Sequence, residues 1–364
     1  MKNGLFEIVN RIYLWIYCFV NGTVYHILSI KRTKKLPNLT KHEKAEVVEY
    51  WSKYKKITGC VHEYKWFKSK GKLDKRLIPE ELWHADIEPY FNNVLLEKAF
   101  QDKNYYEMVV GKNNSPETIV HCINGQLLDE NYLPIDYVEA SRLINSEGEV
   151  ICKASMGTSG GRGIKFISEY IEANDIEKII ELYDKNFLIQ KIIKQHPLIE
   201  SFNKTSVNTM RIITFLYKGK VHFIYGELRF GGAGARLDNS AAGGRWVLIN
   251  KDGIIQNEFY IFDKSTTDMY VDKNYVSPIA ENTSIPNWDE VILLLKQTHY
   301  KLAHFGIIYW DVSISQSGNP IILEYNLLDS DAYAYQYGVG PFFGDMTEQV
   351  LSEIYLQQKN SNPC

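Results

Sequence analysis

The sequence has few cysteines and no excess of basic charge, and each shortage narrows the possible functions. Its five cysteines are scattered, odd in number and without C-x-x-C spacing, which indicates reduced thiols in a cytoplasmic chain and no zinc site. The formal net charge is -3, whereas a nucleic-acid-binding domain would be strongly basic. We therefore expect a cytoplasmic protein that binds no nucleic acid.

A long uninterrupted apolar run is also missing. Residues 5–28 place apolar side chains at helical spacing, but Glu7 and Arg11 are among the polar residues that interrupt them. Such a segment predicts an amphipathic helix, and neither a membrane span nor a secretory signal. A basic cluster follows at residues 31–35. Two interpretations stay open: a helix packed on its own domain, or peripheral contact of residues 5–35 with an anionic membrane surface, such as the inner face of a membrane.

The remaining pattern predicts a mixed α+β chain of two or three lobes, because 364 residues can bury a large core. Thr40 is a predicted N-cap, and Asn124-Gly125 is a hairpin signal. The predicted helices cover residues 42–54, a segment beginning at 80, and residues 93–103, 171–182 and 288–305; the predicted strands cover 106–110, 117–123, 187–193, 209–217, 221–229, 246–249, 307–314 and 320–325.

A glycine-rich stretch, KASMGTSGGRGIKFI at residues 153–167, is the first candidate for chemistry. Clustered glycines allow backbone N–H groups to converge on an anion. The stretch lacks the G-K-[ST] ending of a P-loop, and apolar alternation follows it where a dinucleotide fingerprint has a helix. It predicts either a flap over phosphates between two antiparallel strands or a long hairpin without a ligand.

An acidic hairpin near the end of the chain is the second candidate. Residues 307–314 carry Asp311, a Ser317-Gly318-Asn319 turn follows, and residues 320–326 carry Glu324 and Asn326. Side chains two apart on a strand share a face, and antiparallel pairing brings Asp311 opposite them. Two carboxylates and an amide suit Mg²⁺. The alternative is a solvated acidic face, although the apolar flanks favour burial.

These motifs together resemble a known family. VICKASMGTSGGRGIKFI resembles the phosphate loop of ATP-grasp enzymes, and WDVSISQSGNPIILEYN resembles their metal-binding hairpin. The segments QHP (195–197), SVNTMRIITF (206–215), DNSAAGG (238–244) and GPFFGD (340–345) are similar to the sugar-transfer-associated ATP-grasp group found among polysaccharide gene products. The resemblance covers about residues 75–350 and implies an α+β ATP-grasp fold with a helical N-terminal extension.

The resemblance also implies roles for individual residues. Asp311, Glu324 and Asn326 would hold Mg²⁺. Arg211 and Arg229 would bind the transferred phosphoryl group or the acyl phosphate, and Asn239 would position phosphate or substrate. The alternative for either arginine is a surface or interlobe ion pair. His196, Arg236 and Arg245 lie beside the matched positions and are candidates for binding an anionic acceptor. The residues implied to bind ATP are Lys103, Lys153, Gly157, Thr158, Ser159, Gly160, Gly161, Gly163, Gln190, Lys191 and Ile193.

The function implied is that of an ADP-forming ligase that activates a carboxylate as an acyl phosphate and transfers it to an amine. The closest resemblance points to a hexuronic acid or an amino acid used in polysaccharide biosynthesis. Two alternatives remain: an ATP-dependent phosphotransferase, and a non-catalytic partner of a glycosyltransferase at the membrane surface. The expected division is an amphipathic segment (1–40), a helical region (41–100) and two ATP-grasp subdomains (101–195 and 196–364).

Overall fold

The computed structural model describes residues 2–57, 59–157, 162–239, 243–263 and 268–357, without the side chains of residues 2–6, 263 and 357. The chain forms two compact units. The first combines residues 1–95 and 304–307 with 327–364, and the second combines residues 96–303 with 308–326. The predicted four-part division stays a prediction. None of the described helices is long and apolar enough to cross a membrane.

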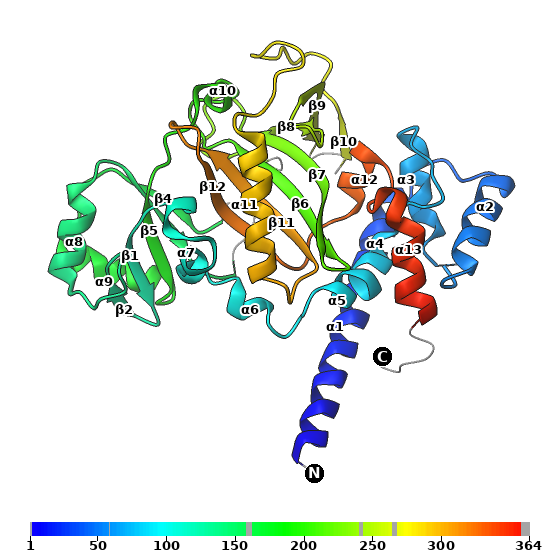
Figure 1. The fold of residues 1–364 in the computed structure, drawn as a ribbon, viewed down its shortest axis with the longest axis horizontal. Coiled ribbons are helices and arrows are strands. Elements are labelled where there is room, and N and C mark those ends of the chain that lie inside the picture. The colour runs from blue at the N-terminus through cyan, green and yellow to red at the C-terminus, as the bar shows by residue number, and fades with distance from the viewer. Residues whose placement is uncertain (1, 58, 158–161, 240–242, 264–267, 358–364) are drawn as a thin grey trace. The chain divides into compact units, whose positions relative to one another are not determined.

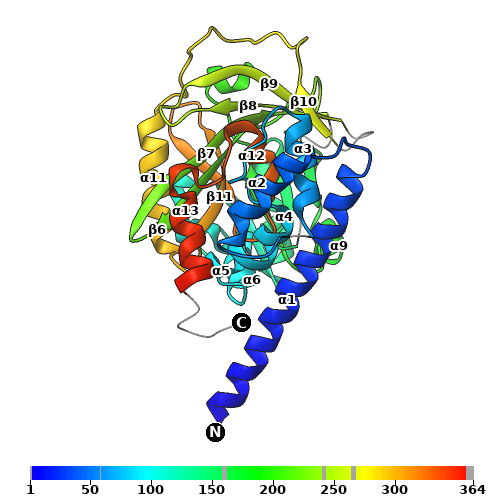
Figure 2. The same ribbon diagram turned by 90° about the vertical axis from the view of Figure 1, so that its right-hand side faces the viewer.

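The first unit is helical and is assembled from both ends of the chain. The long helix α1 packs its C-terminal half against α4, and its N-terminal half extends past the other helices of this unit (Figure 1, Figure 2). Gly22 permits this packing, because a Cβ there would lie 2.9 Å from Ala85 Cβ. The elements are α1 (Lys2–Thr33), α2 (Lys41–Ser52), the 3₁₀ turn η1 (Val61–Glu63), α3 (Tyr64–Ser69), α4 (Glu80–Leu82), the π-helix η2 (Trp83–Ile87), α5 (Glu88–Phe91), α12 (Tyr333–Val339), the 3₁₀ turn η6 (Gly344–Met346), α13 (Thr347–Ser352) and the π-helix η7 (Glu353–Gln357).

The capping and turn chemistry agrees with several of the sequence predictions. Thr40 caps α2 in a capping box with Glu43, as its position before an amphipathic run predicts. Asn124 and Gly125 both have positive φ, and they join two antiparallel strands as a two-residue hairpin loop requires.

The second unit contains two antiparallel sheets with helices against them (Figure 1). The smaller sheet has the order β2-β1-β5-β3-β4, and a buried apolar cluster joins it to α8 and α9. Its elements, with the short helices that precede the sheet, are α6 (Glu97–Phe100), η3 (Lys103–Tyr105), α7 (Tyr106–Val110), η4 (Lys112–Asn114), β1 (Thr118–Ile123), β2 (Gln126–Leu128), α8 (Tyr137–Ser146), β3 (Val150–Ala154), β4 (Ile164–Ile167), α9 (Ala173–Leu182) and β5 (Phe187–Lys191).

The larger sheet has the order β10-β9-β8-β7-β6-β11-β12. Helix α11 lies across one of its faces (Figure 1), where His299 Nδ1 is 2.7 Å from Thr214 Oγ1 and Trp310 donates to the same hydroxyl. The elements are α10 (Pro197–Glu200), β6 (Thr209–Tyr217), β7 (Lys220–Phe230), β8 (Arg245–Ile249), β9 (Ile255–Asp263), β10 (Asp268–Val271), α11 (Trp288–Lys301), β11 (Ile307–Ile314) and β12 (Pro320–Asn326).

Four predicted elements were wrong in type or extent. Residues 106–110 form helix α7 and not a strand, because the chain turns there through η3, which the Asp102 side chain caps. The predicted helix 93–103 shrinks to the single turn α6. The predicted strand 187–193 ends at Lys191, and the predicted helix 288–305 ends at Lys301.

Candidate active site

The face of the larger sheet opposite α11 carries a row of charged side chains. Arg211 on β6 donates from Nε and Nη2 to the two carboxylate oxygens of Asp311 on β11, at 2.6 and 2.8 Å. Arg229 on β7 donates to Asp311 Oδ1 at 2.9 Å. The two arginines and Asp311 therefore form one ion cluster, in which Asp311 is buried and the arginines are half-buried.

Electrostatics in this cluster favour the ionised carboxylate. Burial alone would raise the pKa of Asp311, but the guanidinium groups of Arg211 and Arg229 outweigh burial and lower it below the ordinary value. Both oxygens of Asp311 thus act as ion-pair acceptors in this state.

The acidic hairpin has the register that the sequence predicts. Asp311 is paired with Glu324 across β11 and β12, next to a β-bulge between Asp311 and Val312. Asn326 lies two residues beyond Glu324 on the same face, and its Nδ2 is 3.5 Å from the Tyr309 carbonyl oxygen. The structure therefore brings the three predicted metal ligands to one end of one hairpin.

Lys103, which precedes the smaller sheet in the chain, contacts this hairpin. Lys103 Nζ lies 3.0 Å from Glu324 Oε1, and the Lys103 ammonium is largely buried. The backbone N–H of Lys103 donates to Ser155 O, just past the end of β3. Lys103 therefore connects the acidic hairpin to the root of the glycine-rich loop.

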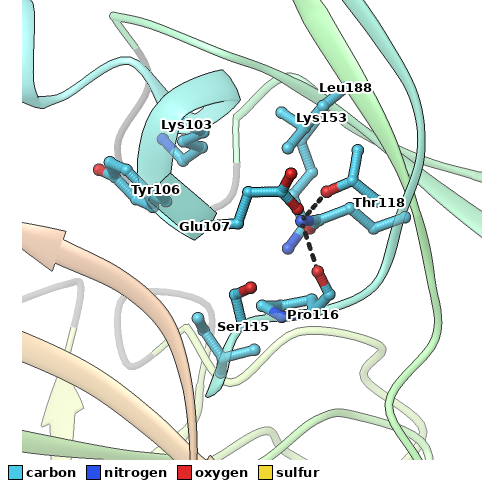
Figure 3. Close-up of a pocket in the computed structure, with 10 residues that line it drawn as sticks. Lys103, Tyr106, Glu107, Ser115, Pro116, Thr118, Lys153 and Leu188 are labelled. Carbon is cyan, nitrogen blue, oxygen red and sulfur yellow. Dashed lines mark hydrogen bonds between the residues drawn. The ribbon is translucent and has the colours of Figure 1, made fainter. Parts of the chain in front are cut away.

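A pocket beside Lys103 collects further predicted residues (Figure 3). Gln190 Nε2 donates to Thr118 Oγ1 at 3.2 Å and to Pro116 O at 3.4 Å, which are the dashed lines of Figure 3. The pocket is lined by Lys103, Tyr106, Glu107, Ser115, Pro116, Thr118, Lys153, Leu188, Gln190 and Leu323. Two cationic side chains, Lys103 and Lys153, thus share one pocket.

The Lys153 ammonium has an unusual environment. Burial lowers its pKa to about 8; Glu324 opposes this shift and the nearby Lys103 adds to it. Two lysines held this close favour an anionic ligand between them, because an anion would relieve their repulsion.

The glycine-rich loop connects β3 and β4, which pair antiparallel from Val150–Ile167 to Lys153–Ile164. Ala154 N donates to Gly163 O and closes the base of the loop. Gly157 and Gly163 have φ values of 68° and 71°, which only glycine adopts readily. The predicted ligands Thr158, Ser159, Gly160 and Gly161 lie outside the described residues.

Two of the remaining predicted residues are held by neighbouring side chains or backbone. Arg236 makes a two-pronged ion pair with Glu149 at 2.6 and 2.7 Å and covers the Phe166 ring. His196 Nδ1 accepts the backbone N–H of Leu198 at the start of α10. In this structure, both residues are therefore bound to other groups of the same chain.

The others lie on both sheets of the second unit and in the segments next to them. Arg245 on β8 pairs with Asp272 at 2.8 Å, and Lys191 pairs with Glu117 and Glu147. Ile193 lies two residues past the end of β5. The backbone carbonyl oxygen of Asn239 accepts the backbone N–H of Gly244.

A family comparison decides the assignment. The model of the family described as sugar-transfer associated ATP-grasp matches residues 83–340, more than half of the chain. The chain belongs to this ATP-grasp family. The predicted family and the predicted α+β ATP-grasp fold are both confirmed.

Solved structures similar to this ATP-grasp chain share little sequence with it. An ADP complex of N5-carboxyaminoimidazole ribonucleotide synthetase is 11% identical, with a TM-score of 0.37, over 64% of this chain and 45% of that one. D-alanyl-alanine synthetase A from Vibrio cholerae O1 biovar eltor str. N16961 is 12% identical, with a TM-score of 0.41, over 70% and 65%. D-alanine–D-alanine ligase from Bacillus anthracis is 13% identical, with a TM-score of 0.40, over 72% and 69%.

The chain therefore spans less than two thirds of the length of the first two structures. No curated protein sequence matches it. The family assignment rests on the family model alone.

Sequence reasoning missed three acidic residues of this candidate site. Asp238 is hydrogen-bonded to Thr209 and lies 3.5 Å from Arg229, and Glu227 pairs in register with Arg211. Burial raises the pKa of both carboxyls, against the lowering effect of Arg229. Glu227 could have been found, because it lies two residues before Arg229 on a predicted strand.

The third missed residue gave no local signal. Glu107 lines the pocket, and its Oε1 is buried with no hydrogen-bond partner among the described residues. Its Oε1 is 3.7 Å from His121 Nε2. It lies in a segment that was predicted as a strand but forms helix α7, so the sequence could not show that its side chain faces the pocket.

Proposed function

We propose that this protein is an ATP-dependent ligase that joins a carboxylate to an amine and releases ADP and phosphate. The observation that carries the proposal is the contact between Lys103 and Glu324 at 3.0 Å. It couples a pocket with two lysines, suited to phosphates, to a hairpin of oxygen donors, suited to a divalent cation. Magnesium-nucleotide binding requires both features at one place.

The proposed nucleotide site uses residues of the smaller sheet and of the segments next to it. Lys103 and Lys153 neutralise phosphate oxygens, and Gly157 and Gly163 with the loop residues Thr158, Ser159, Gly160 and Gly161 cover them. Gln190, Lys191 and Ile193 contact the base, the last two through backbone groups. Phosphate binding would release Lys103 from Glu324, since the anion replaces the carboxylate as its partner.

The donor set of the hairpin fits Mg²⁺. Glu324 offers a carboxylate and Asn326 an amide oxygen, the hard ligands that this ion prefers. Asp311 would complete the set through a lone pair of Oδ2, because arginine hydrogen bonds occupy both lone pairs of Oδ1 and one of Oδ2. When bound, the ion supplies charge neutralisation of the phosphates.

Chemistry in the proposed reaction has two steps. A substrate carboxylate oxygen attacks the γ-phosphorus, the bond to the bridging oxygen breaks, and ADP leaves with that electron pair. The amine nitrogen then attacks the acyl carbon, phosphate leaves, and the nitrogen loses a proton. Arg211 and Arg229 stabilise the oxyanions that develop in both steps, and Asn239 positions the phosphoryl group.

For the substrates we propose a hexuronic acid or an amino acid as the carboxylate, used in making a cell-surface polysaccharide. This finer proposal rests on the family, whose description names sugar transfer. His196, Arg236 and Arg245 are proposed to bind the acceptor, which requires Arg236 to exchange Glu149 for the acceptor anion.

The test is ADP release with panels of uronic acids and amino acids against panels of amines. We expect release to require both partners and the product to contain an amide. ADP release with one substrate and a stable phosphorylated product would instead identify a phosphotransferase. No ADP release from any pair, with no binding of Mg·ADP, would favour the non-catalytic alternative.

We also propose peripheral membrane contact through α1, at the inner face of the membrane. A wide face of this helix is exposed and apolar, including Ile12, Trp15, Ile16 and Phe19. Basic residues at 31–35 follow. This composition suits an anionic lipid surface, and a lipid-linked acceptor would be within the reach of an enzyme bound there.

A further inference from the structure

Glu80 and His84 form a buried pair in the helical unit, away from the nucleotide residues in sequence. They are one turn apart at the junction of α4 and the π-helix η2. Their exposed fractions are 1% and 0%. π-helical turns are rare and frequently mark functional sites.

Each of the two side chains is fixed by one atom and leaves another atom without a hydrogen bond. Glu80 Oε1 accepts the backbone N–H groups of Ala332 and Tyr333 at 2.9 and 2.8 Å. His84 Nδ1 lies 3.2 Å from Glu88 Oε2. The other atoms, Glu80 Oε2 and His84 Nε2, are buried and have no hydrogen-bond partner among the described residues.

The separation between these two atoms is close to that of two ligands to one ion. They are 3.7 Å apart, which is an ion-pair distance when the imidazole is protonated but is too long for a hydrogen bond. Metal–ligand bonds of about 2.1 Å at angles of about 110 to 120° separate two ligand atoms by roughly 3.4 to 3.6 Å. Asp331 offers a third ligand: one ligand atom from each of Glu80, His84 and Asp331 lies within 4.8 Å of the others.

The surroundings of His84 resemble the outer shell of a metal site. A ligating histidine usually donates its second ring N–H to a carboxylate, which fixes the tautomer and aims the lone pair at the metal. Glu88 occupies that position, and its oxygens also accept the backbone N–H groups of Asp329 and Ser330. The Tyr25 ring stacks on the imidazole, with centroids 3.5 Å apart, and limits its rotation.

Two comparisons within the chain narrow the choice of site. Glu107 and His121 show the same 3.7 Å separation, but no third histidine, cysteine or acidic ligand joins them among the described residues. On the other side of His84, Asp329 and Glu88 could form a second group, but hydrogen bonds already occupy Glu88 and Nδ1.

We propose that Glu80, His84 and Asp331 bind a divalent transition-metal ion, with Zn²⁺ as the representative. One imidazole nitrogen with two carboxylates favours Zn²⁺, Mn²⁺ or Fe²⁺ over Mg²⁺ or Ca²⁺, which prefer oxygen ligands alone. The ion would connect α4 and η2, which carry Glu80 and His84, to Asp331 just before α12. These segments are far apart in the sequence. Its role is to stabilise the helical unit.

The test is Zn²⁺ titration of the full chain after EDTA stripping, without nucleotide, in competition with a chromophoric zinc indicator. We expect one equivalent bound by the wild type. Asp331→Asn changes an exposed side chain and should fold normally, and we expect it to weaken Zn²⁺ binding at least tenfold. Glu80→Gln keeps the acceptor oxygen for Ala332 and Tyr333, and should have the same effect.

Two controls separate this site from others. Asp329→Asn, a matched change on the opposite side of the imidazole, should bind Zn²⁺ within about twofold of the wild type. Glu324→Gln disables the proposed Mg²⁺ hairpin and should also leave Zn²⁺ binding intact, so this proposal and the ligase proposal can fail separately. The site is overturned by absence of stoichiometric binding, by equal affinity in Asp331→Asn, or by loss in Asp329→Asn or Glu324→Gln.

Discussion

Asp311 is the residue on which the charges of the candidate site converge. It accepts hydrogen bonds from Arg211 and Arg229 and faces Glu324 across the hairpin. This carboxylate offsets the repulsion between the two half-buried guanidinium groups of Arg211 and Arg229. In the proposed reaction, the entering phosphoryl group would give the arginines a second anion to bind. Each guanidinium group would then keep an anionic partner throughout phosphoryl transfer.

Glu324→Gln tests the proposed catalytic role of the hairpin. We expect ATP turnover to fall by about 100-fold or more, because the amide removes the negative charge offered to Mg²⁺. The free energy of unfolding should change by about 1 kcal/mol or less, since the Glu324 side chain is 31% exposed. Steady-state ADP release and thermal unfolding measure the two quantities. Glu290→Gln, an exposed site on α11, is the matched control; equal turnover in both variants would remove the metal assignment.

The lowered pKa of Lys153 predicts how nucleotide affinity depends on pH. Burial lowers its pKa to about 8, so its ammonium group is charged below pH 8 and becomes neutral as the pH rises above it. Bound phosphate favours the charged form, so the Kd for Mg·ADP should stay level below about pH 7 and rise by up to about tenfold per unit above pH 8.

Calorimetric titrations from pH 6.5 to 9.5 would show this dependence. Lys153→Arg is the control, because a guanidinium group stays charged throughout this range. The variant should lose the alkaline fall in affinity even if its binding is weaker overall. An identical alkaline fall in the variant would assign the effect to another group.

At the scale of elements, α1 has two halves with different surroundings. Its C-terminal part packs Gly22, Tyr25 and Arg32 against its own unit, where the Arg32 guanidinium lies 3.6 Å above the Tyr333 ring. Trp15 and Phe19 stack on each other and are 57% and 61% exposed. One end of α1 therefore packs on its own unit, and the other end presents an exposed apolar surface.

The double substitution Trp15→Glu and Phe19→Glu tests the membrane proposal at the exposed end. We expect vesicles containing anionic lipid to float the wild-type protein and not the variant, because each substitution puts a charge on the face that would enter the lipid. Thermal unfolding should be unchanged, since both side chains are exposed. Deleting residues 1–35 is a poorer test, because it also removes Tyr25 and Arg32. Equal flotation of wild type and variant would reject this contact.

The elements also show which parts of the fold local sequence could predict. The hairpin of β11 and β12 follows from apolar alternation around a glycine turn, so the pairing of Asp311 with Glu324 was predictable. Helix α12 was not: its sequence YAYQYGV has no local helix signal, and its first N–H groups are accepted by Glu80, which is distant in the chain. Helix α8, by contrast, was missed although Asp136 caps it.

The same reasoning applies to the two sites. Lys103 was proposed because a family resemblance relates distant motifs, whereas Glu324 and Asn326 were proposed from the hairpin pattern alone. The i, i+4 spacing of Glu80 and His84 was visible in the sequence, but it carries no meaning until folding brings Asp331 to it. Sites assembled from both ends of a chain are the ones that local patterns cannot reveal.

At the scale of the whole molecule, the two proposed ligands belong to different compact units. The Mg·ADP residues lie in the unit of residues 96–303 and 308–326, and the proposed Zn²⁺ ligands lie in the unit that contains both chain ends. A ligand that binds only the folded state lowers the population of opened states in the unit that holds it.

Hydrogen exchange followed by mass spectrometry should therefore separate the two ligands. We expect Mg·ADP to slow exchange in β3, β4 and β12, and Zn²⁺ to slow exchange in residues 80–91 and 333–339. Asp331→Asn should abolish only the Zn²⁺ effect, and Glu324→Gln only the nucleotide effect. Slowing of both regions by either ligand alone would contradict separate sites and would instead require energetic coupling between the two units.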